Sequence, residues 1–290
     1  MFEQLGLIGC GLMGGSFALA VKKAGLVKRV VGYSKSPSTT ERARQMGIID
    51  VEAPSALLAV SGADLVLVAV PVSASEATFK AIRHLITPNM LIMDVGSTKL
   101  DVVEAARRVL GAHLGSFVPA HPIAGKEVSG VEHADAELYI GKQVILTPVE
   151  KTQVGKLKKA IDLWEAMGCH VQQMAPESHD AAFAAVSHMP HLLAFALMHA
   201  ITSQPLGKDF LALGGPGFRD FTRIAASDPK MWRDVLVANK HEVVEQAKMF
   251  QRSLLNMLQL VEDSQGEKLE AMIEQASQSR AHWRMGQKGK

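Results

Sequence analysis

Near its N-terminus the chain reads Leu5-Gly6-Leu7-Ile8-Gly9-Cys10-Gly11-Leu12-Met13-Gly14-Gly15-Ser16. This run places the pattern G-x-G-x-x-G between an apolar strand and the start of an amphipathic helix. In such a turn Gly9 allows a tight bend, Gly11 lets the backbone approach a pyrophosphate, and Gly14 lets the helix pack closely on the strand. The helix N-terminus then offers free N–H groups to phosphates. The run therefore predicts a dinucleotide-binding, Rossmann-type domain.

Outward from this run, strands and helices alternate through residues 1–175, which is typical of βαβ units around a parallel sheet. The expected strands are 4–8, 29–33, 65–70, 90–95, 117–120, 143–147 and 170–174. The expected helices are 13–24, 39–46, 55–60, 75–84, 99–110 and 151–167. Several strands are almost wholly apolar, as strands buried on both faces are.

After residue 175 the β-branched runs vanish, and helical spacing of Ala, Leu, Met, Glu and Gln predicts a second, all-α domain over 176–290. Its last third carries an apolar stripe at intervals of three and four residues: Val244, Ala247, Phe250, Leu254, Leu258 and Val261. The stripe either packs within the domain or forms a subunit interface, and the length of the helix favours a homodimer. The basic segment 280–290 is expected to be a solvated, mobile end.

Composition narrows the class of protein. The 290 residues suffice for two domains. The 31 basic and 29 acidic residues leave a net charge of +2, too even for the cationic surface that nucleic-acid binding needs. The longest apolar run, from Leu65 to Val72, is far shorter than the roughly 20 residues of a membrane span. A soluble, cytoplasmic protein is expected, with Cys10 and Cys169 as reduced thiols.

The cofactor is predicted from the end of the second strand. The position that usually holds a ribose-binding acid is Ser34, followed by Lys35 and Ser36. These side chains suit the 2′-phosphate of NADP, so the sequence favours NADP as the cofactor and leaves NAD possible. The alternative is that the three residues form an ordinary polar loop. The remaining expected cofactor contacts are Leu12 and Met13 in the glycine turn and Val70 and Pro71 at the end of the third strand.

Two further strand ends carry candidate catalytic residues. Ser97, in Asp94-Val95-Gly96-Ser97-Thr98-Lys99, could direct its hydroxyl at a substrate or cap the next helix. His121 opens the segment His121-Pro122-Ile123-Ala124-Gly125-Lys126-Glu127 and is placed for proton transfer near a nicotinamide. The alternative for His121 is a solvated loop histidine.

The helical half supplies candidate substrate-binding residues. His188 and His191 lie three apart on one helix face and either line a polar pocket or are structural, since no third ligand at diagnostic spacing supports a metal. After the helix break at Gly214-Gly215, Arg219 and Arg223 lie four apart, so they are expected to share a helix face and bind a carboxylate. Arg219 could equally pair with a nearby acid.

Five motifs in this order resemble those of the prephenate and arogenate dehydrogenase family of tyrosine biosynthesis. They are G-C-G-L-M-G-G-S, D-V-G-S-T-K, H-P-I-A-G-K-E-x-S-G, S-H-M-P-H and G-F-R-D-F-T-R-I-A-x-S-D-P-x-x-W-R-D. The resemblance implies a Rossmann-type domain, a helical dimerisation domain and an active site in the cleft between them. The implied reaction oxidises a cyclohexadienol by hydride transfer to a nicotinamide while a ring carboxylate leaves as carbon dioxide.

The resemblance also implies roles for individual residues. His121 would match the catalytic histidine, Ser97 the serine beside the same hydroxyl, and Arg223 an arginine that binds a substrate carboxylate. His188, His191 and Trp232 would match pocket residues, and Glu127 an acid near the entrance. Ser34 replaces the Asp of other members and resembles the NADP-using branch, and the sequence ends without a regulatory ACT domain or a fused chorismate mutase.

Two other functions remain open at this point. A β-hydroxyacid dehydrogenase also begins with such a glycine turn, but it relies on a lysine in the helical domain and lacks H-P-I-A-G. A redox sensor that binds NADP(H) would leave His121 and Arg223 unexplained. The choice between prephenate and arogenate depends on pocket contacts that the sequence does not reveal.

Overall fold

The computed structural model describes residues 1–284 of the chain. The chain divides into two compact units, Met1–Lys240 and His241–Lys290. The change from strands to helices comes earlier, at Pro176, where the sequence predicts the domain boundary. The first unit is longer than the predicted domain because the helices after Pro176 hydrogen-bond to the sheet domain, as the bonds of Asp180 and Asp234 show.

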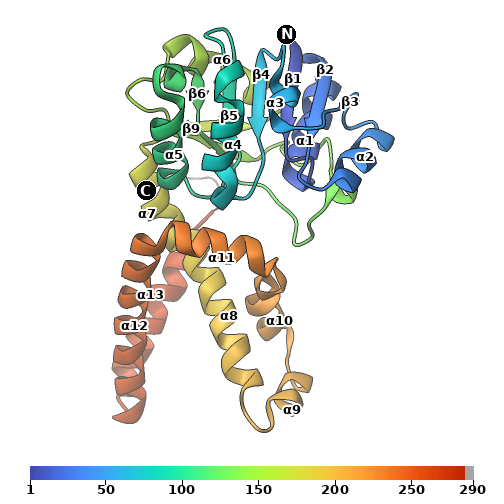
Figure 1. Ribbon diagram of the computed structural model, residues 1–290. Coiled ribbons are helices and arrows are strands. Elements are labelled where there is room, and N and C mark those ends of the chain that lie inside the picture. Colours follow the sequence, from blue (N-terminus) through green and yellow to red (C-terminus); the bar gives the residue numbers. More distant parts are fainter. Residues whose placement is uncertain (285–290) are drawn as a thin grey trace. The chain divides into compact units, whose positions relative to one another are not determined.

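The first unit is built on a six-stranded parallel sheet in the order β3-β2-β1-β4-β5-β6 (Figure 1). The strands are β1 (Phe2–Ile8), β2 (Val27–Tyr33), β3 (Val51–Glu52), β4 (Leu65–Val68), β5 (Leu91–Asp94) and β6 (Phe117–Val118). The helices of this part are α1 (Leu12–Lys23), α2 (Pro37–Gln45), α3 (Ala56–Val60), α4 (Ser75–Ile82), α5 (Leu100–Leu110) and α6 (Val154–Ala166). This order confirms the Rossmann-type fold expected from the sequence.

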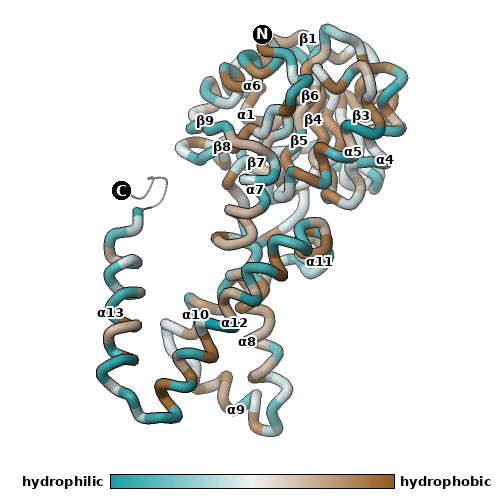
Figure 2. The backbone as a smooth tube through the Cα atoms, turned by 90° about the vertical axis from the view of Figure 1, so that its left-hand side faces the viewer, coloured by the Kyte–Doolittle hydropathy of each residue, from teal (hydrophilic) through white to brown (hydrophobic). Residues whose placement is uncertain are grey.

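Apolar side chains explain why these segments form a central sheet. The residues of β4 and β5 are all buried, as parallel strands covered on both faces must be. The buried side chains form two large clusters, one containing Leu5, Phe17 and Trp164 and the other Phe79 and Phe117. Figure 2 shows the strands of this sheet as largely hydrophobic.

The strand predicted at 117–120 is wrong in one respect. It is two strands, because Pro119 separates β6 from β7 (Ala120–Pro122), and a proline has no N–H with which to continue a ladder. Strand β7 belongs to a second sheet of order β7-β8-β9, antiparallel to β8 (Gln143–Leu146), which is parallel to β9 (His170–Gln173). The two-residue strand β3 is too short for its pattern to be seen in the sequence.

The rest of the first unit is helical, as predicted. It contains α7 (Pro176–Phe183), a π-helical turn (Ala184–His188), α8 (Met189–Thr202), α9 (Gly207–Ala212), α10 (Pro216–Thr222) and α11 (Pro229–Ala238). The Asp228 side chain caps α11 by accepting hydrogen bonds from the Lys230 and Met231 N–H groups, and Pro229 occupies the first turn.

One helical stretch, Pro176–Thr202, is long and apolar enough to cross a membrane by length and composition alone. It includes His179 and Asp180, which are buried and bound to other parts of the first unit. These bonds tie the start of the stretch to the sheet domain, although only 22% of its apolar window is buried. The expectation that the chain has no membrane span stays a prediction.

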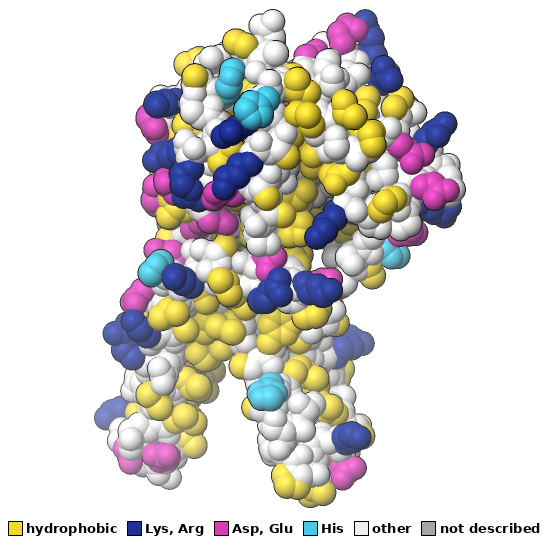
Figure 3. All heavy atoms as spheres, in the orientation of Figure 1, with side chains coloured by type: hydrophobic (Ala, Val, Ile, Leu, Met, Phe, Trp, Pro, Cys, Tyr) yellow, Lys and Arg dark blue, Asp and Glu magenta, His cyan; other side chains and the backbone are white. Residues whose placement is uncertain are grey.

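The second unit consists of α12 (Lys240–Glu262), whose first residue belongs to the first unit, and α13 (Gly266–His282). The predicted stripe on α12 is exposed in the single chain at Val244, Phe250, Leu254, Leu258 and Val261. Figure 3 shows apolar side chains at the surface of this part of the chain. The segment predicted to be mobile begins inside α13, which is helical to His282, and residues 285–290 lie outside the described residues.

A buried ion pair joins the two sheets of the first unit. The Lys99 side chain is fully buried, and its Nζ donates to the Asp94 carboxylate and to the Ala120 carbonyl, the latter at 2.7 Å. The same carboxylate accepts hydrogen bonds from the N–H groups of Ala120, at 3.1 Å, and Gly96, at 2.9 Å. Asp94 ends β5 and Ala120 begins β7, so this pair fixes one sheet to the other.

We expect Lys99→Met to lower the free energy of unfolding by about 3–5 kcal/mol, because it leaves the Asp94 charge buried without a partner. The matched control is Lys158→Met, which removes an exposed i,i+4 pair with Asp162 and is expected to cost less than about 0.5 kcal/mol. Urea denaturation of the two variants measures the difference. A loss below about 1 kcal/mol for Lys99→Met would contradict a structural role for the pair.

Candidate functional site

The glycine turn has the close packing that its sequence predicts. Gly9 has a φ of +97°, and a Cβ at this position would lie 2.1 Å from the Ala69 carbonyl oxygen. A Cβ at Gly14 would lie 2.0 Å from the Gly9 carbonyl oxygen. Both contacts exclude any larger residue, because the obstructing atoms belong to the backbone.

Gly11 has the opposite surroundings. It precedes α1, no side chain of the described residues caps that helix, and a Cβ here would meet none of their atoms within 4 Å. Free N–H groups thus face open space at the point where the strand order reverses between β1 and β4. This arrangement fits the pyrophosphate of a dinucleotide. The other expected cofactor contacts border the turn: Leu12 and Met13 begin α1, and Val70 and Pro71 follow β4.

Ser34 is tied directly to the glycine turn. Its Oγ accepts a hydrogen bond of 2.8 Å from the Cys10 N–H, and its hydroxyl also lies beside the Cys10 thiol. Lys35 and Ser36 are exposed beside it, and the Ser36 hydroxyl lies 2.8 Å from that of Ser38. Burial raises the pKa of Cys10 to about 11, which favours the protonated thiol.

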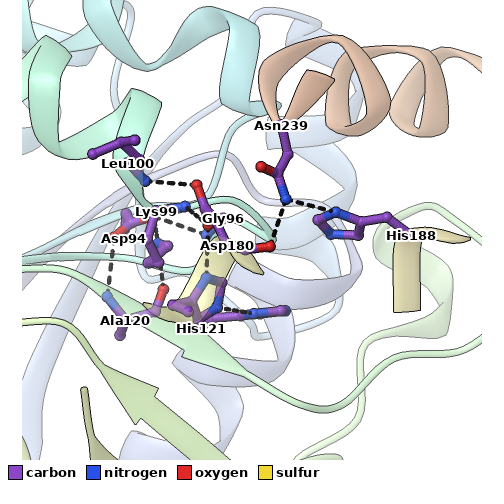
Figure 4. A network of polar contacts seen from close by, with 10 residues as sticks. Asp94, Gly96, Lys99, Leu100, Ala120, His121, Asp180, His188 and Asn239 are labelled. Atoms are coloured by element: carbon purple, nitrogen blue, oxygen red, sulfur yellow. Dashed lines mark hydrogen bonds and ion pairs between the residues drawn. The ribbon is translucent and has the colours of Figure 1, made fainter. Parts of the chain in front are cut away.

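His121 lies within β7 instead of in a solvated loop, and the residue is 9% exposed. Its Nδ1 lies 2.8 Å from Nε2 of His179, a residue of α7. His121 is labelled in Figure 4. The ring of Phe183 stacks on His179 at a centroid distance of 4.4 Å and contacts His121 at 4.8 Å. The His121 imidazole is therefore held between strand β7, which ends at Pro122, and the ring of Phe183.

The surroundings keep this imidazole uncharged. Burial lowers the pKa of His121 well below its usual value, and the Lys99 ammonium lowers it further. A neutral imidazole carries a lone pair on one nitrogen and can therefore accept a proton at neutral pH. The geometry thus supports the role of general base that the sequence suggested for His121.

Ser97 is half-buried and is not the cap of α5. The first N–H groups of that helix, on Lys99 and Leu100, instead donate to the Asp180 carboxylate at 2.8 and 3.0 Å. The cap therefore comes from about 80 residues further along the chain, which local sequence cannot reveal. Within residues 1–284 the Ser97 hydroxyl is not used at this helix start, so it could contact a substrate.

His188, His191 and Trp232 come together as the resemblance implied. The His191 ring stacks on the Trp232 indole at a centroid distance of 3.6 Å, and the His188 ring meets the same indole edge-on at 6.2 Å. His188 ends the π-helical turn, a distortion often found at functional sites. The metal alternative gains no support, since the described residues contain no group of three or more potential ligands.

The tautomers of the two histidines follow from their partners. The Asn239 Nδ2 donates to the Asp180 carbonyl at 2.8 Å and faces Nδ1 of His188 at 3.1 Å, so that nitrogen accepts and Nε2 carries the proton. His191 Nδ1 donates to the Ser187 carbonyl at 2.9 Å. Burial lowers the pKa of His188 to about 4, which keeps it neutral.

Two buried donors in this cluster have no hydrogen-bond partner among the described residues: Nε2 of His188 and Nε1 of Trp232. Buried polar groups are rarely left without a partner, because the loss costs about 1–3 kcal/mol. Acceptor atoms of a bound ligand would satisfy both groups.

Arg219 and Arg223 do not share a helix face. Helix α10 ends at Thr222, and Arg223 begins a 3-10 turn, so the two arginines bind different acids. Arg223 pairs with Glu127, and both side chains are more than half exposed. Arg219 pairs with its neighbour Asp220 at 3.3 Å, as the alternative interpretation allowed.

Both halves of the chain match models of one protein family. The family model of the prephenate dehydrogenase nucleotide-binding domain matches residues 17–173, and that of the dimerization domain matches residues 175–275. The chain belongs to the prephenate dehydrogenase family. Membership favours an enzyme of this family over the β-hydroxyacid dehydrogenase and redox-sensor alternatives.

Relatives within this family match most of the chain. The prephenate dehydrogenase of Bacillus subtilis is 36% identical over all of this chain and 78% of its own length. The cyclohexadienyl dehydrogenase of Zymomonas mobilis is 34% identical over 82% of each chain. A crystal structure of the Aquifex aeolicus prephenate dehydrogenase with hydroxyphenyl propionate and NAD+ has a TM-score of 0.90 and 37% identity, covering 97% of this chain and 98% of that one.

Several residues of this candidate site could not be predicted from the sequence. They are His179, Asp180, Asn239, Asp94 and Lys99, which connect the predicted residues to one another. The adjacent pair His179-Asp180 at the start of a helix was the available signal. It was not distinctive, because its significance depends on contacts with residues far away in the sequence.

Proposed function

We propose that the protein catalyses the NAD(P)-dependent oxidative decarboxylation of prephenate, arogenate or both, giving 4-hydroxyphenylpyruvate or tyrosine. The observation that carries this proposal is the neutral, buried His121 held in the neighbourhood of buried donors without partners. Family membership supports it, as do the printed activities of the relatives. The substrate is then a cyclohexadienol bearing carboxylates.

Each residue has a defined task in this reaction. His121 takes the proton of the ring hydroxyl through Nε2, and the Ser97 hydroxyl orients the same oxygen. Arg223 binds a substrate carboxylate, and the unpartnered N–H groups of His188 and Trp232 donate to the remaining acceptor atoms. Holding the substrate in this way aligns the carbinol hydrogen for transfer.

The glycine turn would hold the nicotinamide dinucleotide, with Gly11 and the N-terminus of α1 at its pyrophosphate. When bound, this cofactor supplies the hydride acceptor. Loss of the ring carboxylate as carbon dioxide delivers its electron pair to the ring, and the ring becomes aromatic. The protein therefore needs a base, carboxylate recognition and a cofactor site, and it has candidates for all three.

We expect His121→Asn to lower kcat by about 10²-fold or more while largely sparing the affinity for the cofactor. Because the pKa of His121 is lowered, the base stays active at and somewhat below pH 6.5, and the acid limb of the wild-type profile lies below this value. Steady-state kinetics from pH 5 to 9, followed by nicotinamide absorbance, test both points. A near-normal kcat for the variant would remove His121 from the mechanism.

We expect Arg223→Ala to raise KM for the substrate by about tenfold or more, since a charged hydrogen bond to a carboxylate contributes roughly 1.5–3 kcal/mol. The matched control is Arg108→Ala, which also breaks an exposed arginine-glutamate pair, with Glu76. Its KM should stay within about twofold of the wild-type value. An unchanged KM in Arg223→Ala would leave the arginine as a structural partner of Glu127.

We propose NADP+ as the preferred cofactor. Ser34 donates to the 2′-phosphate while its oxygen accepts from Cys10, and the exposed Lys35 and Ser36 add a charge and a donor. We expect NADP+ to exceed NAD+ in kcat/KM by about ten- to hundredfold, and Ser34→Asp to reverse the preference, because a carboxylate repels the phosphate. Wild-type enzyme that uses NAD+ at least as well as NADP+ would contradict this assignment.

We propose that residues 176–290 form a functional substrate and dimerisation domain, and that the protein is a homodimer. The exposed stripe on α12 supports a subunit interface, because an apolar surface of this length is costly in water. Light scattering at micromolar concentration is expected to give twice the chain mass of 31.2 kDa. A monomer mass would contradict the interface.

A further inference from the structure

His121 is the end of a buried chain of three polar side chains. The Asp180 carboxylate lies 2.7 Å from Nδ1 of His179, and Nε2 of His179 lies 2.8 Å from Nδ1 of His121 (Figure 4). The His179 and Asp180 side chains are 0% and 4% exposed. The contacts therefore lie in surroundings where hydrogen bonds are strong and directional.

The proton positions along this chain follow from Asp180. Its carboxylate also accepts hydrogen bonds from the Lys99 and Leu100 N–H groups. Burial raises its pKa, but these bonds and the one from His179 lower it more, so the carboxylate is ionised and can only accept. His179 must then carry its proton on Nδ1 and accept at Nε2. His121 in turn donates from Nδ1, and its Nε2 is left with the lone pair.

We propose that His179 and Asp180 are positioning residues that hold His121 in the Nδ1–H tautomer and delocalise the positive charge formed when it takes the substrate proton. This proposal rests on the proposed function of His121 as the base. Without the dyad, a neutral imidazole has no fixed preference for the tautomer that leaves Nε2 free. The dyad thus prepares the base before the substrate binds.

The proton movements balance within this chain. The O–H bond of the substrate breaks and an Nε2–H bond forms on His121, while the hydride leaves with its electron pair to the nicotinamide cofactor of the proposed function. The Nδ1 proton of His121 can shift to Nε2 of His179, which becomes an imidazolium beside the Asp180 carboxylate. The reverse shift returns that proton, and His121 releases the substrate proton from Nε2 to water after the product leaves.

The other charged and titratable groups near the chain make this stabilisation necessary. Lys99 at the start of α5 lowers the pKa values of both His121 and His179, and His188 on the π-helical turn lowers that of His121. Asp94 on β5 raises the pKa of His179 but is itself bound to Lys99. Asp180 is therefore the carboxylate best placed to offset the new charge.

The first test compares two variants of His179. In His179→Gln the amide oxygen can accept the hydrogen bond from Nδ1 of His121, but the amide cannot take up the proton. In His179→Phe the side chain can do neither of these. We expect kcat to fall by about 10-fold or more in the Gln variant and further in the Phe variant. The KM values for the ring substrate and for the nicotinamide cofactor should stay within about threefold of the wild-type values. The acid limb of kcat/KM should shift, because His179 and Asp180 no longer act on the charged form of His121.

A second measurement reads the tautomer directly and requires no variant to fold. Long-range ¹H–¹⁵N NMR spectra of the imidazoles in wild-type protein are expected to show His121 protonated at Nδ1 and bare at Nε2. In His179→Phe the Nε2–H form should become populated. The control His84→Gln, at an exposed histidine away from the site, should leave both the tautomer and the kinetics unchanged.

The outcomes separate the two hypotheses. A wild-type His121 protonated at Nε2, or a His179→Gln variant with unchanged kcat and pH profile, overturns the positioning role. A His121→Asn variant with normal kcat overturns the proposed base, whereas the tautomer in the wild-type spectrum still supports or refutes the dyad on its own.

Discussion

The Asp180 carboxylate is the interaction on which the arrangement of the candidate site depends. One of its oxygens meets His179, and together its two oxygens accept the first N–H groups of α5. A single buried charge thus caps a helix of the sheet domain and orients a residue of α7. Its own backbone carbonyl accepts from Asn239, which extends the same connection to His188. Burial makes such a group costly unless every lone pair is used, and here most are.

The balance of buried charges also explains why a base can exist in this interior. The buried Lys99 is neutralised by Asp94, yet it still disfavours a second positive charge on the imidazole of His121. His121 is consequently neutral before the substrate binds. It can take up a proton only when a negatively charged group is close enough to stabilise the new positive charge. Burial is the main cause of the lowered pKa of His121, and the Lys99 ammonium of the ion pair that holds the two sheets together lowers it further.

Steric constraints, by contrast, define the proposed cofactor site. Gly9 and Gly14 lie against backbone atoms, whereas Gly11 faces open space beside an uncapped helix start. Close packing and an unobstructed helix N-terminus are the two properties that a dinucleotide phosphate requires. Ser34 ties the end of β2 to this turn through the Cys10 N–H, so the residue proposed to recognise the ribose also supports the turn.

The sequence by itself determined the features that depend on short spacing. The glycine turn, the apolar strands and the helical periodicity predict the Rossmann-type sheet and the later helices, because each of these patterns is formed by residues close together in the sequence. The change of sheet at Pro119, the true cap of α5 and the different partners of Arg219 and Arg223 could not be predicted in this way. Each depends on where a residue from another part of the chain comes to lie. The link from Asp180 through His179 to His121 is likewise a product of the tertiary structure, since only packing brings α7 against β7 and fixes the protons between them.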